Sequence, residues 1–184
     1  RLRSHHRHMP VVSGSSGREL AASLADIMGM EYVSLESRKF PDGEGYVRVP
    51  SESFELIRSE PVILVSNTYP DSGIMRTILL LEAIGDVRRG DLSNYRGEEP
   101  QKLDDVGPGV YLAIPYFGYA RQDKRFSPGE AISARVIADI MGRICEGIVI
   151  LDLHEPMVLE NMSVPVKFVS SMPEIADLLG NDSK

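Results

Sequence analysis

The chain has 184 residues and a formal net charge of −7, with 27 acidic side chains against 20 basic ones. A chain this acidic is a poor candidate for general nucleic-acid binding, and no apolar run is long enough to suggest a membrane span or a signal peptide. The single cysteine, Cys145, rules out an intramolecular disulfide. We therefore expect a cytoplasmic protein, with Cys145 as a small buried apolar residue rather than a reactive thiol.

The first nine residues, RLRSHHRHM, differ from the rest because they hold three of the four histidines. Without their three arginines, 17 basic side chains remain against 27 acidic ones, a formal charge of about −10. We interpret residues 1–9 as a tag-like or disordered tail, with Met9 as the natural first residue. A histidine-rich metal site is the less favoured alternative. Residues 10–184 are expected to form a single domain.

A short strand over Pro10–Ser13 and a helix over Arg18–Met28 are the first predicted elements. The segment between them, Ser13–Gly17, leads into the helix start, where free backbone N–H groups can bind phosphate. It lacks the lysine of a P-loop, so we favour a plain N-cap and turn. The helix is predicted from apolar side chains that share one face: Leu20, Leu24, Ile27 and Met28.

Two predicted strands, Glu31–Leu35 and Gly45–Val49, flank the segment KFPDGE. Pro-Asp-Gly is a turn sequence, so spacing alone favours a simple hairpin turn. The alternative is a ligand site in which Phe40 offers a stacking surface while Asp42 and Glu44 offer hydrogen-bond acceptors.

The apolar run Pro61–Ser66 is typical of a parallel strand that is buried on both faces. It leads through the loop Asn67–Asp71 into a helix. The polar stretch 85–109 has little periodicity, and we interpret it as a long surface insertion. The helix before this insertion is predicted from Ile74, Ile78, Leu81 and Ile84.

The apolar strand Val110–Ile114 stops at Pro115 and is followed by an aromatic, glycine-containing loop and the charged run RQDKR. A further helix is expected to begin at Ser127–Glu130, where proline and glutamate suit a first turn. Its apolar stripe is Ile132, Val136, Ile140 and Ile144, and the remaining elements are a strand Gly147–Leu153, a short strand Val164–Val169 and a helix from Ser171 to Leu179.

Strands that alternate with helices predict an α/β fold with a mostly parallel sheet flanked by helices, plus one early β-hairpin. Ligands bind such sheets beyond the carboxyl ends of the strands. Two polar groups lie there, Arg121–Arg125 after one strand and Asp152 with His154 after another. Asp152 and His154 lie on one side of the strand and suit a divalent cation, while arginine suits a phosphate. Spacing alone therefore predicts an anionic ligand with Mg²⁺, and leaves open a structural histidine and a solvated charged surface.

Four strings carry a resemblance to a known family: SGSS, KFPDGE, IPYFGYARQDKR and DLH, which occur in this order over roughly Pro10–Leu179. The chain resembles the N-terminal half of the ribose-phosphate pyrophosphokinases, the phosphoribosyl pyrophosphate (PRPP) synthetases. The string YARQDK is highly specific for them. The strings FPDGE and FSPGEAIS look more like the archaeal branch. The fold implied is a phosphoribosyltransferase-like half.

The resemblance implies transfer of the β,γ-diphosphate of Mg·ATP to the anomeric hydroxyl of ribose 5-phosphate, which gives PRPP and AMP. The adenine would stack on an aromatic side chain and have its edge read by carboxylates, often from the neighbouring subunit of a homo-oligomer. The residues implied for Mg²⁺ are His154 and Asp152. Those implied for ATP are Phe40, Asp42, Gly43, Glu44, Arg121, Gln122 and Asp123, with Phe40 stacking on adenine and Asp42 and Glu44 reading its edge.

The chain also departs from the family. The family's second half carries a catalytic lysine-arginine loop and a loop that cradles the 5-phosphate of ribose, and neither motif occurs here. We therefore expect the C-terminal domain to be absent, no catalytic residue in this half and no PRPP formation by the chain alone. Ribose 5-phosphate would bind only with the missing half.

There are two smaller departures. The insertion 85–109 is longer than the family's usual link between helix and strand, and a cation site also differs. Ser163 and Lys167 replace acidic residues that contribute to that site in some members. The alternative function is a non-catalytic subunit that associates with a PRPP synthetase, in a regulatory or nucleotide-binding role.

Overall fold

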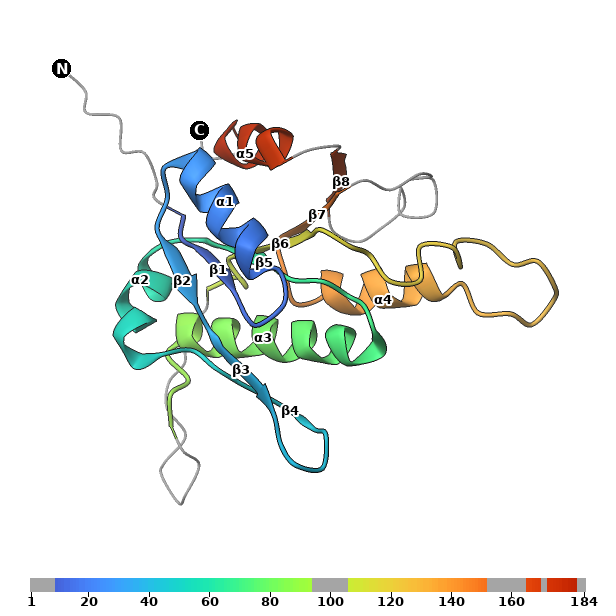
Figure 1. Cartoon of the computed structure of the whole chain (residues 1–184), viewed down its shortest axis with the longest axis horizontal. Helices are drawn as coiled ribbons and strands as arrows, with labels where there is room; N and C mark the ends of the chain where they lie inside the picture. The colour runs from blue at the N-terminus through green and yellow to red at the C-terminus, as the bar shows by residue number, and fades with distance from the viewer. Residues whose placement is uncertain (1–8, 94–105, 152–164, 170–171, 182–184) are drawn as a thin grey trace.

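A computed structural model describes residues 9–93, 106–151, 165–169 and 172–181, and Figure 1 shows its elements in chain order. The strands are β1 Val11–Ser13, β2 Tyr32–Ser34, β3 Glu36–Lys39, β4 Gly45–Arg48, β5 Val62–Val65, β6 Val110–Ile114, β7 Gly147–Leu151 and β8 Val166–Val169. The helices are α1 Arg18–Met28, the 3₁₀ turn η1 Ser51–Ser53, α2 Phe54–Ser59, α3 Asp71–Arg89, α4 Ser133–Gly142 and α5 Met172–Asn181.

The six strands of the main sheet run parallel in the order β2-β1-β5-β6-β7-β8. Strands β3 and β4 form a separate antiparallel pair. This architecture confirms the predicted α/β fold and its early hairpin. Within the described parts of the chain, no helix combines the length and apolar character needed to cross a membrane.

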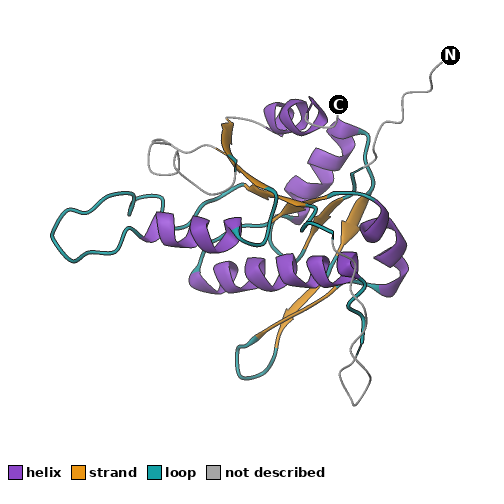
Figure 2. Ribbon diagram, turned by 180° about the vertical axis from the view of Figure 1, so that it is seen from behind, coloured by secondary structure: helices purple, strands orange, loops and turns teal. Residues whose placement is uncertain are grey.

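Helices cover both faces of the sheet, as Figures 1 and 2 show from opposite sides. Strand β5 illustrates the consequence for the sequence. Val62 and Leu64 belong to the core shared with α2, α3 and α4, whereas Ile63 and Val65 belong to the core shared with α1 and α5. Because successive side chains of a strand alternate between faces, a strand covered on both sides must be apolar throughout.

The hairpin is formed by different residues from those we predicted. Residues 32–34 pair with β1 in parallel, and it is β3 that pairs with β4. The chain changes partner at Leu35, which is buried and donates its backbone N–H to Ser13 O at 2.8 Å. The predicted strand Glu31–Leu35 is therefore a sheet strand, and the polar sequence ESRK of β3 gave no apolar signal for a strand of its own.

Two predicted domain boundaries also need correction. Residues 85–89, which we placed in the surface insertion, belong to α3, where Gly85 and Val87 are buried. The helix ends at Gly90, whose φ of 78° is a left-handed C-cap that glycine adopts without strain. Met9, which we placed in the tail, is only 4% exposed and packs with the core of α1 and α5. Residues 1–8 and 94–105 lie outside the described residues.

Helix α4 begins at Ser133 rather than in Ser127–Glu130. The Glu130 carboxylate accepts the backbone N–H groups of Phe126 and Ser127, at 2.8 and 3.2 Å, and so closes a loop instead of starting a helix. The predicted apolar stripe was also wrong, since Val136 and Ile140 are 47% and 43% exposed. The buried face of α4 consists of Ala134, Ile137, Ala138 and Met141.

Candidate functional site

A cavity of about 1200 Å³ opens at the carboxyl ends of β5 and β6. This is the edge of a parallel α/β sheet at which ligands usually bind. Its walls are the loop after β5 and the longer loop after β6, with Leu151 at the end of β7. The lining residues are 69–72, 115–117, 119–124, 126 and 151.

The loop after β6 is fastened to the loop after β5 by hydrogen bonds. Tyr116 donates its backbone N–H to Asn67 Oδ1 at 2.9 Å, and Gly118 donates its own to Thr68 Oγ1 at 2.9 Å. Thr68 in turn donates its N–H to Tyr116 O at 3.2 Å. The rings of Tyr69 and Tyr116 meet edge to face, with centroids 5.4 Å apart. One wall of the cavity therefore fixes the shape of the other.

The close contact of these loops requires glycine at position 118. A Cβ on Gly118 would lie 2.2 Å from Thr68 O, a distance that no side chain can tolerate. Gly118 is buried there, between residues 115–117 and 119–124 that line the cavity.

The charged run that follows β6 lies where the sequence placed it. Arg121, Gln122, Asp123 and Lys124 all line the cavity, and Arg121 and Lys124 bring positive charge to its mouth. Gln122 ties the run to α4, because its Oε1 accepts a hydrogen bond from Ser133 Oγ at 2.6 Å. Arg125 is not among the lining residues; its Nε donates to Glu130 O within the same loop.

The hairpin tip, by contrast, does not line the cavity. Asp42 Oδ1 accepts the Glu44 N–H at 3.0 Å, and Phe40 N donates to Glu44 O at 2.8 Å, so the tip is a locally closed turn. Gly43 has a φ of 94°, and no atom lies within 4 Å of the position that a Cβ would take there. Phe40 is 39% exposed. The structure thus brings together one half of the predicted ATP contacts and leaves the other half apart within a single chain.

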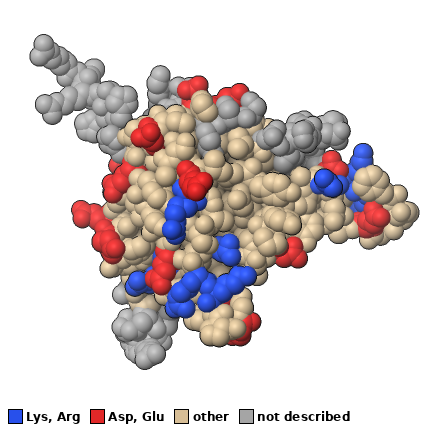
Figure 3. Space-filling model, viewed as in Figure 1, with Lys and Arg blue, Asp and Glu red and all other residues tan. Residues whose placement is uncertain are grey.

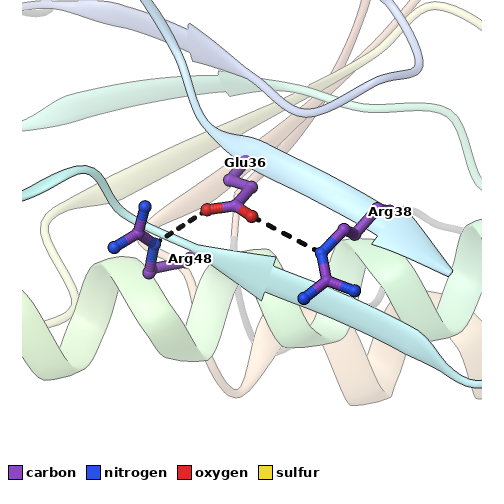
Figure 4. A network of polar contacts seen from close by, with 3 residues as sticks. All are labelled: Glu36, Arg38 and Arg48. Carbon is purple, nitrogen blue, oxygen red and sulfur yellow. Dashed lines mark hydrogen bonds and ion pairs between the residues drawn. The ribbon is translucent and has the colours of Figure 1, made fainter. Parts of the chain in front are cut away.

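A small charged network supports the hairpin below its tip (Figure 4). Glu36 lies between two arginines, with Arg48 Nε at 2.8 Å and Arg38 Nε at 3.5 Å from its carboxylate oxygens. The hydrogen bond from Arg48 lowers the pKa of Glu36 below its ordinary value. The guanidinium of Arg38 also lies 4.2 Å from the ring centroid of Tyr46 and 5.1 Å from that of Phe40, in the range of cation–π contacts.

In the space-filling view, Lys and Arg side chains gather around the hairpin, and a second group with acidic neighbours lies on the projecting loop after β6 (Figure 3). On this face, basic side chains therefore lie at both regions that the sequence singled out. An anionic ligand would be attracted to these regions despite the overall negative charge.

The predicted magnesium residues, Asp152 and His154, lie outside the described residues, as does Ser163. Across the described ranges, no group of three or more His, Cys, Asp or Glu side chains is close enough to hold a metal. Asp123 nevertheless lines the cavity beside Arg121. One carboxylate beside an arginine is a donor set that suits Mg²⁺, which takes few protein oxygens when phosphates supply the others.

Cys145 is 4% exposed, as predicted, and burial raises the pKa of its thiol to about 12. A thiol with that pKa is protonated at neutral pH and is not a nucleophile. It therefore has no part in the site.

Sequence reasoning missed the contribution of the loop after β5, which we treated only as an exit loop. Tyr69 from this loop and Asp71 and Ser72 from the start of α3 line the cavity, together with Tyr116 and Tyr119 from the opposite loop. The one available signal was its position, since it too follows the carboxyl end of a buried parallel strand.

Comparisons with known proteins identify the family to which this chain is related. A family model described as the N-terminal domain of ribose phosphate pyrophosphokinase matches residues 9–89 and 109–144. The unmatched stretch between these blocks falls within the segment we interpreted as an insertion.

Among curated relatives, the ribose-phosphate pyrophosphokinase of Methanothermobacter thermautotrophicus is 36% identical over 170 residues, which cover 91% of this chain and 52% of that protein. The enzyme of the same name from Saccharolobus solfataricus is 33% identical over 171 residues, which cover 91% and 51%. This chain thus spans about half the length of the curated relatives it matches.

The fold is similar to that of the phosphoribosylpyrophosphate synthetase from Mycobacterium smegmatis, a crystal structure matched with a TM-score of 0.64 and 21% identity, over 94% of this chain and 52% of that one. At that identity the likeness concerns the fold alone. The family match over both blocks, which include the cavity-forming loops, shows that the chain belongs to the family of the N-terminal domain of ribose phosphate pyrophosphokinase.

Proposed function

We propose that this chain supplies the Mg·ATP-binding N-terminal half of a ribose-phosphate diphosphokinase, which makes PRPP and AMP from ATP and ribose 5-phosphate. One observation carries the proposal: Arg121 and Lys124 line a cavity at the carboxyl ends of parallel strands in a member of this family. Such a cavity, with two basic side chains and several aromatic rings in its lining, suits a nucleotide's phosphates.

The side chains that line the cavity have different proposed roles, which follow from their chemistry. The Arg121 guanidinium offers two parallel N–H donors to phosphate oxygens. Gln122, held by Ser133, offers an amide at the same wall. Asp123 supplies a carboxylate for Mg²⁺, alongside Asp152 and His154. Mg²⁺ held by these residues would supply neutralisation of phosphate charge, and diphosphate transfer would then depend mainly on positioning and charge stabilisation.

The adenine-binding residues proposed are Phe40, Asp42, Gly43 and Glu44 at the hairpin tip. They are not among the residues that line the cavity of their own chain. A second copy of the chain in a homo-oligomer would bring a hairpin tip to the cavity, and the partly exposed Phe40 ring offers the stacking surface.

Titration calorimetry with Mg·ATP tests the proposal. The wild-type chain is expected to bind, and Arg121→Ala is expected to bind about tenfold or more weakly, because it loses a charge-assisted bidentate contact. Arg143→Ala is the matched control, since Arg143 is an exposed arginine at the opposite end of α4. Equal affinities of wild type and Arg121→Ala would remove Arg121 from the site.

The same polypeptide is expected to release no AMP from ATP in response to ribose 5-phosphate. The chain spans about half of its relatives, and we propose that the ribose 5-phosphate site belongs to the other half. AMP release that depends on ribose 5-phosphate, measured by chromatography, would overturn this part of the proposal.

A further inference from the structure

Tyr119 has a backbone conformation that its side chain disfavours. Its φ is 64°, and it is the one residue other than glycine with a positive φ among the residues that the structure describes. Bulky side chains rarely adopt this left-handed region, and strain of this kind persists only where surrounding contacts impose it. Tyr119 also lines the cavity, two residues before Arg121.

One contact that holds Tyr119 is a hydrogen bond from its hydroxyl to Asp71 Oδ1, 2.6 Å long. Asp71 is the first residue of α3, a helix of 19 residues that is anchored in the core by Leu80 and Leu81. A negatively charged side chain is favoured at a helix N-terminus, so the position suits a carboxylate acceptor. The bond to Asp71 raises the pKa of Tyr119, which keeps the hydroxyl protonated as a donor.

The backbone of Tyr119 shapes the residues that follow. Gln122 N donates to Tyr119 O at 2.9 Å, which closes the turn that contains Arg121. Gln122 is in turn bonded to Ser133, the first residue of α4. The turn is thus held between the starts of two helices, by Tyr119 on the α3 side and by Gln122 on the α4 side.

We propose that Tyr119 is a positioning residue of the Mg·ATP site: its hydroxyl, bound to Asp71, holds the turn that directs Arg121 and Gln122 into the cavity. This inference rests on the proposed function. It differs from a purely structural role in what it predicts. A positioning role changes loop order and ligand affinity, with little effect on the stability of the whole domain.

The first test is Tyr119→Phe, which removes the hydroxyl and keeps the ring. Tyr32→Phe is the matched control, because Tyr32 loses a hydroxyl bonded to Ser13 Oγ at 2.8 Å, in a strand away from the cavity. Hydrogen exchange of the ligand-free chain is measured at residues 116–122. Tyr119→Phe is expected to speed exchange there by about threefold to tenfold, the worth of one hydrogen bond, and the control to leave it unchanged.

The second readout is the dissociation constant of Mg·ATP by calorimetry. Tyr119→Phe is expected to raise it by about threefold to tenfold, with a thermal midpoint close to that of Tyr32→Phe. Unchanged exchange at residues 116–122 would overturn the proposal, and so would faster exchange with unchanged affinity. If the wild-type chain binds no Mg·ATP, the proposed function fails, and the exchange result by itself decides whether Tyr119 holds the loop.

A double-mutant cycle identifies Asp71 as the partner. Asp71→Ala removes the hydrogen-bond acceptor and also a negative charge that repels phosphates, so its effect is compared in the wild-type chain and in the Tyr119→Phe variant. In the wild-type chain, Asp71→Ala loses the hydrogen bond, whereas in the Tyr119→Phe variant that bond is already absent. The effect of Asp71→Ala on the Mg·ATP dissociation constant is therefore expected to be about threefold to tenfold less unfavourable in the Tyr119→Phe variant. An equal effect in both chains would show that Tyr119 does not act through Asp71.

Discussion

The loop after β6 and the tip of the hairpin are both proposed to contact ATP, but they obtain their shapes in different ways. The loop depends on partners about fifty residues away in the sequence, because Thr68 and Asn67 hold its backbone. The hairpin tip is closed by bonds among its own residues, from Phe40 to Glu44. A change in the loop should therefore spread to the sheet edge, whereas a change in the tip should stay local.

The largest expected effect comes from adding one methyl group at Gly118. Gly118→Ala places a Cβ 2.2 Å from Thr68 O, a backbone atom of the loop after β5. We expect the free energy of unfolding to fall by about 3 kcal/mol, the upper part of the range for overpacked sites. Mg·ATP binding should be lost with it, because the two cavity walls are forced apart.

Gly43→Ala is the matched substitution in the hairpin tip. Gly43 also has a positive φ, 94°, but no atom lies within 4 Å of its Cβ position. The free energy of unfolding should fall by only about 1 kcal/mol, because alanine disfavours this left-handed backbone conformation. Urea denaturation of both variants measures the two costs, and equal costs would contradict the contrast between a braced loop and a self-contained tip.

A smaller effect is expected from acid on the hairpin. The pKa of Glu36 is lowered by the hydrogen bond from Arg48, so the ionised network stabilises the folded chain above the unfolded pKa of Glu36. That contribution is lost as the pH falls through the lower, folded pKa. The pair is exposed, so the effect is small.

The test compares the thermal midpoints of wild type and Glu36→Gln between about pH 7 and pH 3, a range that spans the ordinary pKa of a glutamate. At neutral pH the thermal midpoint of the wild type should be slightly higher than that of Glu36→Gln, and this difference should disappear at the acid end of the range. The Mg·ATP affinity of the two chains should be the same at neutral pH. A constant difference across the range would show that the Glu36 charge contributes nothing.

Much of the fold could be predicted because parallel strands covered on both faces leave long apolar runs. The run at β6 gave the strand with its correct ends. Strand β3 could not be found in this way, because its sequence ESRK is polar and its partner lies on a hairpin outside the main sheet. Helix α4 misled us because it is apolar on two sides, and its large side chains Val136 and Ile140 face outward while alanines fill part of the core.

The candidate site could likewise be predicted only in part. Arg121–Lys124 could be predicted, since they follow a buried strand directly and sequence position alone brings them to the edge of the sheet. The contact of Tyr119 with Asp71 could not, because it joins residues 48 positions apart through the packing of a loop against the start of α3. The positive φ of Tyr119 has no sequence signal either, since tyrosine is a residue type that disfavours it.

The central claim is that the strand-end cavity of one copy and the hairpin tip of another copy together form one ATP site. It is tested most directly by mixing Phe40→Ala and Arg121→Ala chains, each of which should bind Mg·ATP weakly alone. Random exchange of subunits should restore wild-type affinity at about one quarter of the sites, because half of the cavities and half of the tips are intact. Calorimetry of the mixture should therefore show a fraction of tight sites. A mixture that binds no better than its two components would contradict the account.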